Sequence, residues 1–414
     1  MSINICKDNT ETSFGASEHE AFREYIAEVD AETVWDTFPL SSVVYAPCST
    51  VVADDLYIGG EDELEDTKLS GVPLVANLPD GKIALMRPYL WKQIKQHHRD
   101  TSPIIGDMAN AGNWEKVCEH LNLGREYLKK SILCMTRGSK ISGWFTEFNT
   151  NRTQSQQLDM LEAQLDKAFP NYKFASGCFN HLYTEASYFL DNSVEDASSL
   201  LGEDSVMAAY TKTWKECGME GDIARALPMV RFLTGESGMT SIVLSPYIVF
   251  PDESTMPLGP SLSLKHRGTD EAVWGKFTEF GSQIAAMYQS GMHALHKLCE
   301  TKIYHPYSTI TRALKPFLAT APWAPIHELV ESYQTFYDPE DEEQTCLAID
   351  IYNSINDFVN GFNADVKSPM RRLQNKENVA RLLMANWQEM DVKKPINLFP
   401  KKEAKTSIFE EEEF

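Results

Sequence analysis

Residues 270–302 have the sequence DEAVWGKFTEFGSQIAAMYQSGMHALHKLCETK, which divides the chain into two parts of different character. Apolar residues recur along it at intervals of three and four, the spacing that places side chains on one face of a helix. These positions are Val273, Phe277, Phe280, Ile284, Met287, Leu295 and Leu298. The stretch therefore predicts a long amphipathic helix from Asp270 to about Lys302.

The chain before this helix carries the signals of β-strands. Residues 172–190 are long and aromatic, and residues 241–250 and 261–266 form two further runs that we expect to pair. Residues 41–45 and 49–58 are rich in Val and Tyr and predict two more strands.

Helices are expected between these strands and throughout the rest of the chain. Ser17 begins a helical pattern that continues to Val29, and Asn113 is a suitable N-cap for a helix towards Met135, with Gly124 as a potential interruption. Thr153 and Gln156 form a capping-box pattern before an apolar run that ends at Phe169. After the long helix we expect helices over residues 326–337, 343–362 and 370–390.

This order of elements predicts an α+β fold. We expect a mixed α+β domain over residues 1–265 and a helical domain over residues 266–390. Residues 391–414 contain two prolines and many lysines, and predict a disordered basic linker that ends in an acidic, Phe-ended tail.

The composition indicates a protein of the cytoplasm, or of the host cytoplasm if the protein is viral. The sequence contains no apolar run of the roughly 20 residues that a membrane span needs, and no signal-peptide pattern at its start. Eight cysteines are scattered without a CxxC pair, which favours reduced thiols over disulfides or a zinc ribbon. No nucleotide-binding or hydrolase motif is present, and no cofactor is expected.

Charge is distributed unevenly along the chain, although the formal net charge is −22. Residues 1–80 contain 3 basic and 17 acidic side chains, and residues 338–366 contain 8 acidic side chains and no basic one. In contrast, residues 81–153 contain 12 basic and 6 acidic side chains, and residues 367–405 contain 10 basic and 4 acidic. Each of these two basic segments can create a local positive field, because the potential near a surface depends on nearby charges.

The first basic segment, residues 81–153, also contains aromatic residues between its cations. Single-stranded nucleic acid requires this combination, since cations bind phosphates and flat rings stack on unpaired bases. We therefore predict a single-strand-binding groove formed by Arg87, Tyr89, Trp91, Lys92, Lys95, Arg99, Lys129, Lys130, Arg137, Lys140, Trp144, Phe145 and Arg152.

The chain ends in SIFEEEEF, in which four glutamates lie between Phe409 and Phe414. Residues 408–414 resemble the acidic, Phe-terminated tails of bacterial and phage single-stranded-DNA-binding proteins. The resemblance implies a tail that competes with DNA for the cationic groove and docks replication or transcription proteins, such as a polymerase. The partner-binding residues would be Phe409, Glu410, Glu411, Glu412, Glu413 and Phe414.

The sequence thus predicts a single-stranded-DNA-binding protein of replication, recombination or transcription, in a phage context, and not an enzyme. The alternative is an acidic interaction or inhibitor protein, a DNA mimic whose negative charge engages basic partners. A third hypothesis is a metal-dependent enzyme. The only candidate ligands are His293, His296 and Glu300, whose spacing places them on one helical face.

Overall fold

The computed structural model describes residues 11–48, 74–99, 103–138, 140–147, 152–190, 227–235, 241–250, 254–265, 270–337, 344–366 and 369–398. The fold is α+β, as predicted. Strands dominate up to Lys265 and helices follow from Asp270, apart from the short pair β14 (Lys302–Ile303) and β15 (Cys346–Leu347). The chain divides into two compact units, and the division falls within the long helix α10 (Asp270–Glu300) instead of before it.

The first unit comprises residues 1–197, 227–247 and 261–286, and contains a six-stranded sheet. The strand order is β2 (Thr33–Pro39), β6 (Ser131–Arg137), β7 (Lys140–Thr146), β5 (Ile83–Met86), β4 (Leu74–Asn77) and β3 (Val44–Pro47). Only β5 and β7 pair in parallel, and the other pairs are antiparallel. β6 and β7 are therefore interior strands of this sheet.

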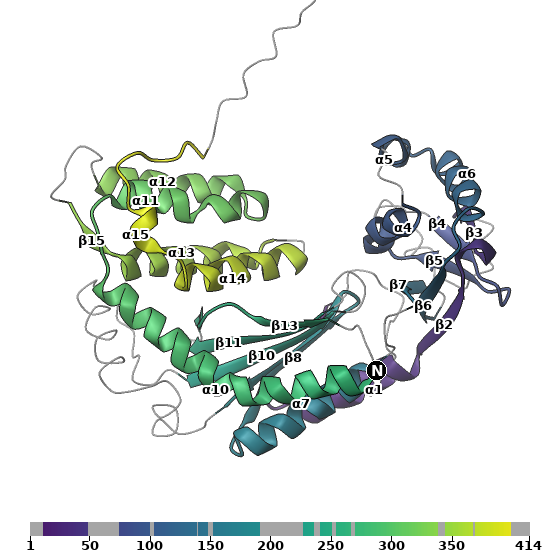
Figure 1. The fold of residues 1–414 in the computed structure, drawn as a ribbon, viewed down its shortest axis with the longest axis horizontal. Helices are drawn as coiled ribbons and strands as arrows, with labels where there is room; N and C mark the ends of the chain where they lie inside the picture. The colour runs from purple at the N-terminus through teal and green to yellow at the C-terminus, as the bar shows by residue number, and fades with distance from the viewer. Residues whose placement is uncertain are drawn as a thin grey trace, which may run out of the picture. The chain divides into compact units, whose positions relative to one another are not determined.

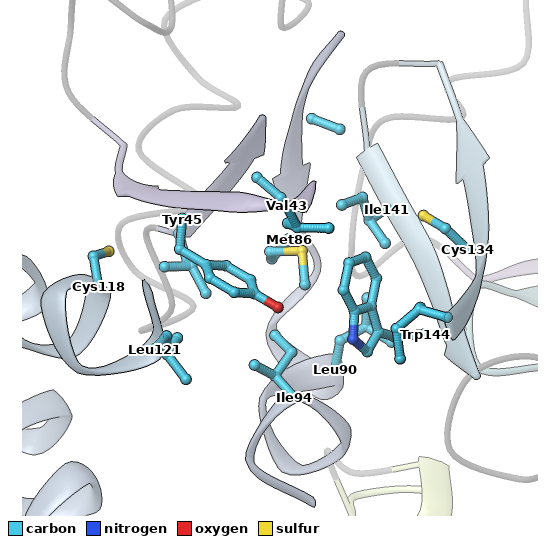
Figure 2. Close-up of a cluster of buried hydrophobic side chains, with 14 of the residues drawn as sticks. Val43, Tyr45, Met86, Leu90, Ile94, Cys118, Leu121, Cys134, Ile141 and Trp144 are labelled. Atoms are coloured by element: carbon cyan, nitrogen blue, oxygen red, sulfur yellow. The ribbon is translucent and has the colours of Figure 1, made fainter. Parts of the chain in front are cut away.

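Three helices pack on one face of the six-stranded sheet: α4 (Trp91–His97), α5 (Pro103–Asn110) and α6 (Trp114–Arg125) (Figure 1). They contribute Ile94, Ile105 and Leu121 to a hydrophobic cluster that also contains Tyr45 and Trp144 from the strands (Figure 2). Burial of these side chains stabilises the sheet, at about 25 cal/mol for each Å² of apolar surface removed from water.

The structure also contains a seven-stranded sheet. Its order is β1 (Thr12–Phe14), β8 (Lys173–Asn180), β9 (Tyr183–Phe189), β10 (Leu227–Gly235), β11 (Ser241–Val249) and β12 (Thr255–Pro257), and β13 (Leu262–Lys265) also pairs with β11. The predicted strands at 172–190 and the predicted pair at 241–250 and 261–266 are confirmed. Phe22 of α1 (His19–Ala31) packs so closely on β8 that a Cβ at Gly177 would lie 2.6 Å from its ring.

Helix α7 (Gln154–Ala168) lies beside α1, and its N-terminus is fixed by side chains. The predicted capping box is confirmed, because Thr153 Oγ1 accepts from the Gln156 amide and Gln156 Oε1 accepts from the Thr153 amide. The Asp30 carboxylate accepts two further amide hydrogen bonds, from Gln154 at 3.0 Å and Ser155 at 2.8 Å. These bonds satisfy donors that a helix N-terminus otherwise leaves unpaired.

The helix predicted from Asn113 towards Met135 is confirmed only in its first half. α6 ends at Arg125, and residues 131–137 form β6. The apolar run Ile132 to Met135 is β-structured because it pairs with β2 on one side and β7 on the other. Tertiary pairing thus overrides the helical pattern.

The second unit comprises residues 198–226, 248–260 and 287–414. It is built from helices, as predicted: the end of α10, α11 (Pro306–Ala313), α12 (Trp323–Phe336), α13 (Ala348–Asn363), α14 (Pro369–Leu383) and α15 (Trp387–Met390). Short 3-10 helices lie at Leu40–Ser42, Pro88–Leu90 and Lys315–Ala319. Tyr352 donates a 3.0 Å hydrogen bond to the Pro257 carbonyl and so ties α13 to β12.

The first residues of the predicted disordered linker are held against the second unit. The Asp391 carboxylate accepts hydrogen bonds from the amides of Tyr304 (2.9 Å) and His305 (2.7 Å), and Leu398 is buried. The strand predicted over 49–58 and the tail from 399 onward lie outside the described residues.

Candidate nucleic-acid interface

The predicted groove residues separate into a buried set and an exposed set. The buried set contains Arg87, Arg137, Lys140, Trp144, Phe145 and Arg152, each less than 7% exposed. The exposed or half-buried set contains Tyr89, Trp91, Lys92, Lys95, Arg99, Lys129 and Lys130. The structure therefore brings together only part of the predicted groove.

Trp144 and Phe145 are buried because they lie on an interior strand whose two faces are both covered. Trp144 points into the cluster beneath the helices, where its ring is 6.0 Å from Phe38 (Figure 2). Phe145 points to the opposite face and stacks on Trp35 at 5.8 Å. Both rings are buried, so neither is exposed to a base in this structure.

Two of the buried cations have side-chain partners inside the protein. Arg87 Nε donates to Ser142 Oγ at 2.9 Å, and Arg137 Nε donates to Thr33 Oγ1 at 2.8 Å. The Arg137 guanidinium also lies over the ring of Phe179, 5.5 Å from its centroid. The Arg152 side chain is buried as well, and the main-chain carbonyl of this residue accepts a 3.5 Å hydrogen bond from the Gln157 side-chain amide. These side chains are placed where they hold the fold rather than where a phosphate could approach.

Helix α4 presents the exposed set because it covers the sheet with one face only. Leu90 and Ile94 are fully buried beneath it, whereas Lys92 is exposed and Lys95 is half-buried. Lys92 and Lys95 are three residues apart, so they share one side of the helix. Trp91 is held by Trp114 in an edge-to-face contact at 5.5 Å, and the Lys95 ammonium lies over its ring at 5.4 Å.

The end of α4 meets the turn between α6 and β6. Lys130 Nζ donates a hydrogen bond to the His97 carbonyl, and this bond joins segments 33 residues apart. Arg99 follows α4 in the left-handed conformation (φ 54°), and its amide donates to the Gln96 carbonyl at 3.0 Å. Burial lowers the pKa of Lys130, and the nearby charge of Arg99 lowers it further. Two cations thus lie close together here.

His97 does not add to this positive charge near neutral pH. Burial lowers its pKa to about 4, the neighbouring Lys130 acts in the same direction, and a hydrogen bond to the Trp144 backbone opposes them. Its neighbour His98 is directed to Tyr45, with 3.0 Å between Nε2 and the phenol oxygen. The cations at this site are therefore the lysines and the arginine.

We call Lys92, Lys95, Arg99, Lys129 and Lys130 the α4 basic face. Residues 87–99 contain no acidic side chain. Within the described part of the chain, no carboxylate lies within the 4.0 Å ion-pair distance of these five cations. A set of cations without internal counter-ions attracts an external anion, because no fixed carboxylate competes for it.

Tyr127 is a surface residue that the sequence pattern did not single out. Its ring is 83% exposed, and Leu123, one turn earlier, is 66% exposed. The predicted helix from Asn113 towards Met135 placed Tyr127 inside a helix, where a tyrosine is more often a packing residue than an exposed one. Its position between Arg125 and Lys129 is the sequence signal that could have revealed it.

The second basic segment lies in the other unit, and some of its cations have partners within the protein. On α14, Arg381 pairs with Glu377 at 3.1 Å, and Arg372 donates to the Val366 carbonyl at 3.3 Å. Arg371 is exposed. Arg381, Lys393 and Lys394 are exposed as well, so the second basic segment also presents cations at its surface.

The candidate metal ligands do not form a metal centre in the described residues. His296 Nε2 lies 3.6 Å from Glu300 Oε1, as an i,i+4 pair on α10, and His293 is exposed. Among all described residues, no group of three or more His, Cys, Asp and Glu side chains is placed to hold a metal ion.

No protein-family model, no curated protein and no solved structure matches this chain. Among the helices that the structure describes, none is both long and apolar enough to cross a membrane.

Proposed function

We propose that this protein binds single-stranded DNA through the α4 basic face and acts in DNA replication, recombination or transcription, in a phage context. The observation that carries the proposal is the set of five cations on α4 and the α6–β6 turn, for which the described residues supply no carboxylate partner. The phosphates of a strand would be the missing counter-ions, and their neutralisation releases condensed cations from the DNA.

The acidic tail fits this proposal as a competitor and a docking peptide. Glu410 to Glu413 place four negative charges next to Phe414. Such a peptide would occupy a cationic surface in the absence of DNA. Once displaced, it would offer Phe414 as an apolar anchor to a replication or transcription protein.

A titration with a fluorescently labelled single-stranded oligonucleotide at two salt concentrations tests the proposal. Binding through five cations predicts that the logarithm of the affinity falls with the logarithm of salt concentration, with a slope of about −0.7 per phosphate contacted. The slope should therefore lie near −2 to −3.5 if about three to five phosphates are engaged. If the protein does not bind the oligonucleotide at low salt, the proposal is wrong.

The burial of cations favours a second candidate, the acidic interaction protein. Arg87, Arg137, Lys140 and Arg152 are withdrawn from the surface, which leaves the exterior of a chain of net charge −22 more acidic than its sequence suggests. A DNA mimic would bind a basic protein partner and would not bind an oligonucleotide. The same titration separates the two candidates.

A further inference from the structure

Tyr127 has an unusual degree of exposure for an aromatic residue in an ordered turn. The residue is 83% exposed, although its amide donates to the Gly124 carbonyl at 3.3 Å and the next amide, of Leu128, donates to the Arg125 carbonyl at 3.1 Å. The backbone is thus fixed while the ring faces water. A single exposed apolar side chain needs no explanation by itself, so its neighbours decide what it can do.

The turn that carries Tyr127 is joined to the end of α4 at two points. On one side, Gly124 approaches the end of α4, since a Cβ there would lie 3.7 Å from His98 Nδ1. On the other side, Lys130 Nζ bonds to the His97 carbonyl. Tyr127 lies between these two anchor points, with Lys129 two residues away. The turn therefore carries an exposed ring beside a cationic surface.

We propose that the ring of Tyr127 stacks on an unpaired base of the bound strand while the α4 basic face holds the adjacent phosphates. This inference rests on the proposed function and names the chemistry of the ligand, an unpaired nucleobase. Trp91 is the other aromatic residue at the site, but the edge contact with Trp114 and the Lys95 ammonium already occupy its ring. Stacking is possible for a single strand and is blocked in a duplex, where the bases stack on one another.

The test compares Tyr127→Ala with Tyr127→Phe and with a matched control, Tyr304→Ala. Tyr304 is also exposed (54%) and also lies beside a lysine, with Lys302 Nζ 5.3 Å from its ring centroid, but it belongs to the second unit. Each variant is titrated with the same single-stranded oligonucleotide over a range of salt concentrations. A duplex of the same sequence is titrated in parallel.

Tyr127→Ala should weaken single-strand binding by about fivefold to a hundredfold, the effect of removing one stacked base. The salt slope should stay unchanged, because the cations that neutralise the phosphates are all still present. Tyr127→Phe and Tyr304→Ala should bind like the wild type, and duplex binding should not respond to any of the three changes. All variants should melt at the wild-type temperature, since the ring is exposed.

Two results would overturn the inference while leaving the proposed function intact. One is wild-type affinity in Tyr127→Ala, and the other is an equal reduction in affinity for single strand and duplex. If the wild-type protein binds no oligonucleotide at low salt, the proposed function fails and the inference fails with it.

Discussion

Residues 87–99 and residues 131–145 have similar compositions but opposite positions in the fold. Both contain lysine or arginine together with Trp, Tyr or Phe. The first forms α4 and its flanks and exposes Lys92 and Arg99, whereas the second forms β6 and β7 and buries Arg137 and Lys140. The difference shows that composition identifies which chemistry a segment can supply, but topology decides whether a ligand can reach it.

The physical cause is the number of faces that each element covers. A helix on the surface of a sheet buries one stripe, here through Leu90 and Ile94, and leaves the opposite side in water. An interior strand has two faces, and successive side chains alternate between them. Trp144 and Phe145 therefore enter two different packed layers, and neither stays at the surface.

The largest expected effect is a difference in stability between variants at Trp144 and at Trp91. Trp144→Ala should lower the free energy of unfolding by about 3–5 kcal/mol, because it leaves a large cavity in the cluster beneath the helices. Trp91→Ala should cost less than half as much, since Trp91 is only partly buried. Urea unfolding followed by circular dichroism measures both. Equal decreases would mean that the two halves do not differ in packing.

The next largest effect is a pH-dependent change in stability caused by His97, which hydrogen-bonds to the Trp144 backbone and so links α4 to β7. Its pKa is about 4 in the folded protein and near 6.5 when unfolded, so between these values the unfolded state binds more protons. The protein should therefore become less stable as pH falls from about 6.5 to about 4, by up to roughly 3 kcal/mol from this residue.

His97→Gln provides the matching measurement, because glutamine does not titrate. The difference in unfolding free energy between wild type and this variant should change between pH 7 and pH 4.5, with the wild type destabilised more. A difference that stays constant over this interval would show that His97 is not held neutral by burial.

A smaller effect is expected from the tail. Deleting residues 408–414 removes the four glutamates that would compete for the α4 basic face. Single-strand affinity should then rise by at least about twofold at low salt, where screening is weakest. Phe414→Ala should leave DNA affinity nearly unchanged but reduce capture of a docking partner. If deletion changes neither DNA affinity nor partner capture, the tail has neither proposed role and serves only to keep the protein in solution.

The elements with a strong period could be predicted from sequence, and the site could be predicted only in part. The amphipathic stripe of α10 and the Thr153–Gln156 capping box depend on local spacing, which the sequence displays directly. The end of α6 at Arg125 depends on the pairing of β6 with β2 and β7, which is a long-range property. For the same reason, charge and aromaticity selected Lys92, which is exposed, together with Arg137 and Trp144, whose burial follows from the sheet order.

The most direct test of the account reverses two charges on the α4 basic face and compares them with a matched pair elsewhere. Lys92→Glu with Lys95→Glu should weaken single-stranded oligonucleotide binding and reduce the magnitude of the salt slope by about 0.7 for each phosphate that the protein no longer neutralises. Lys276→Glu with Lys297→Glu changes the net charge equally at two exposed positions of α10 and should have a much smaller effect. If both double variants bind alike, or if the first keeps wild-type affinity and slope, the α4 basic face is not the binding site, and residues 367–405 become the segment to test next.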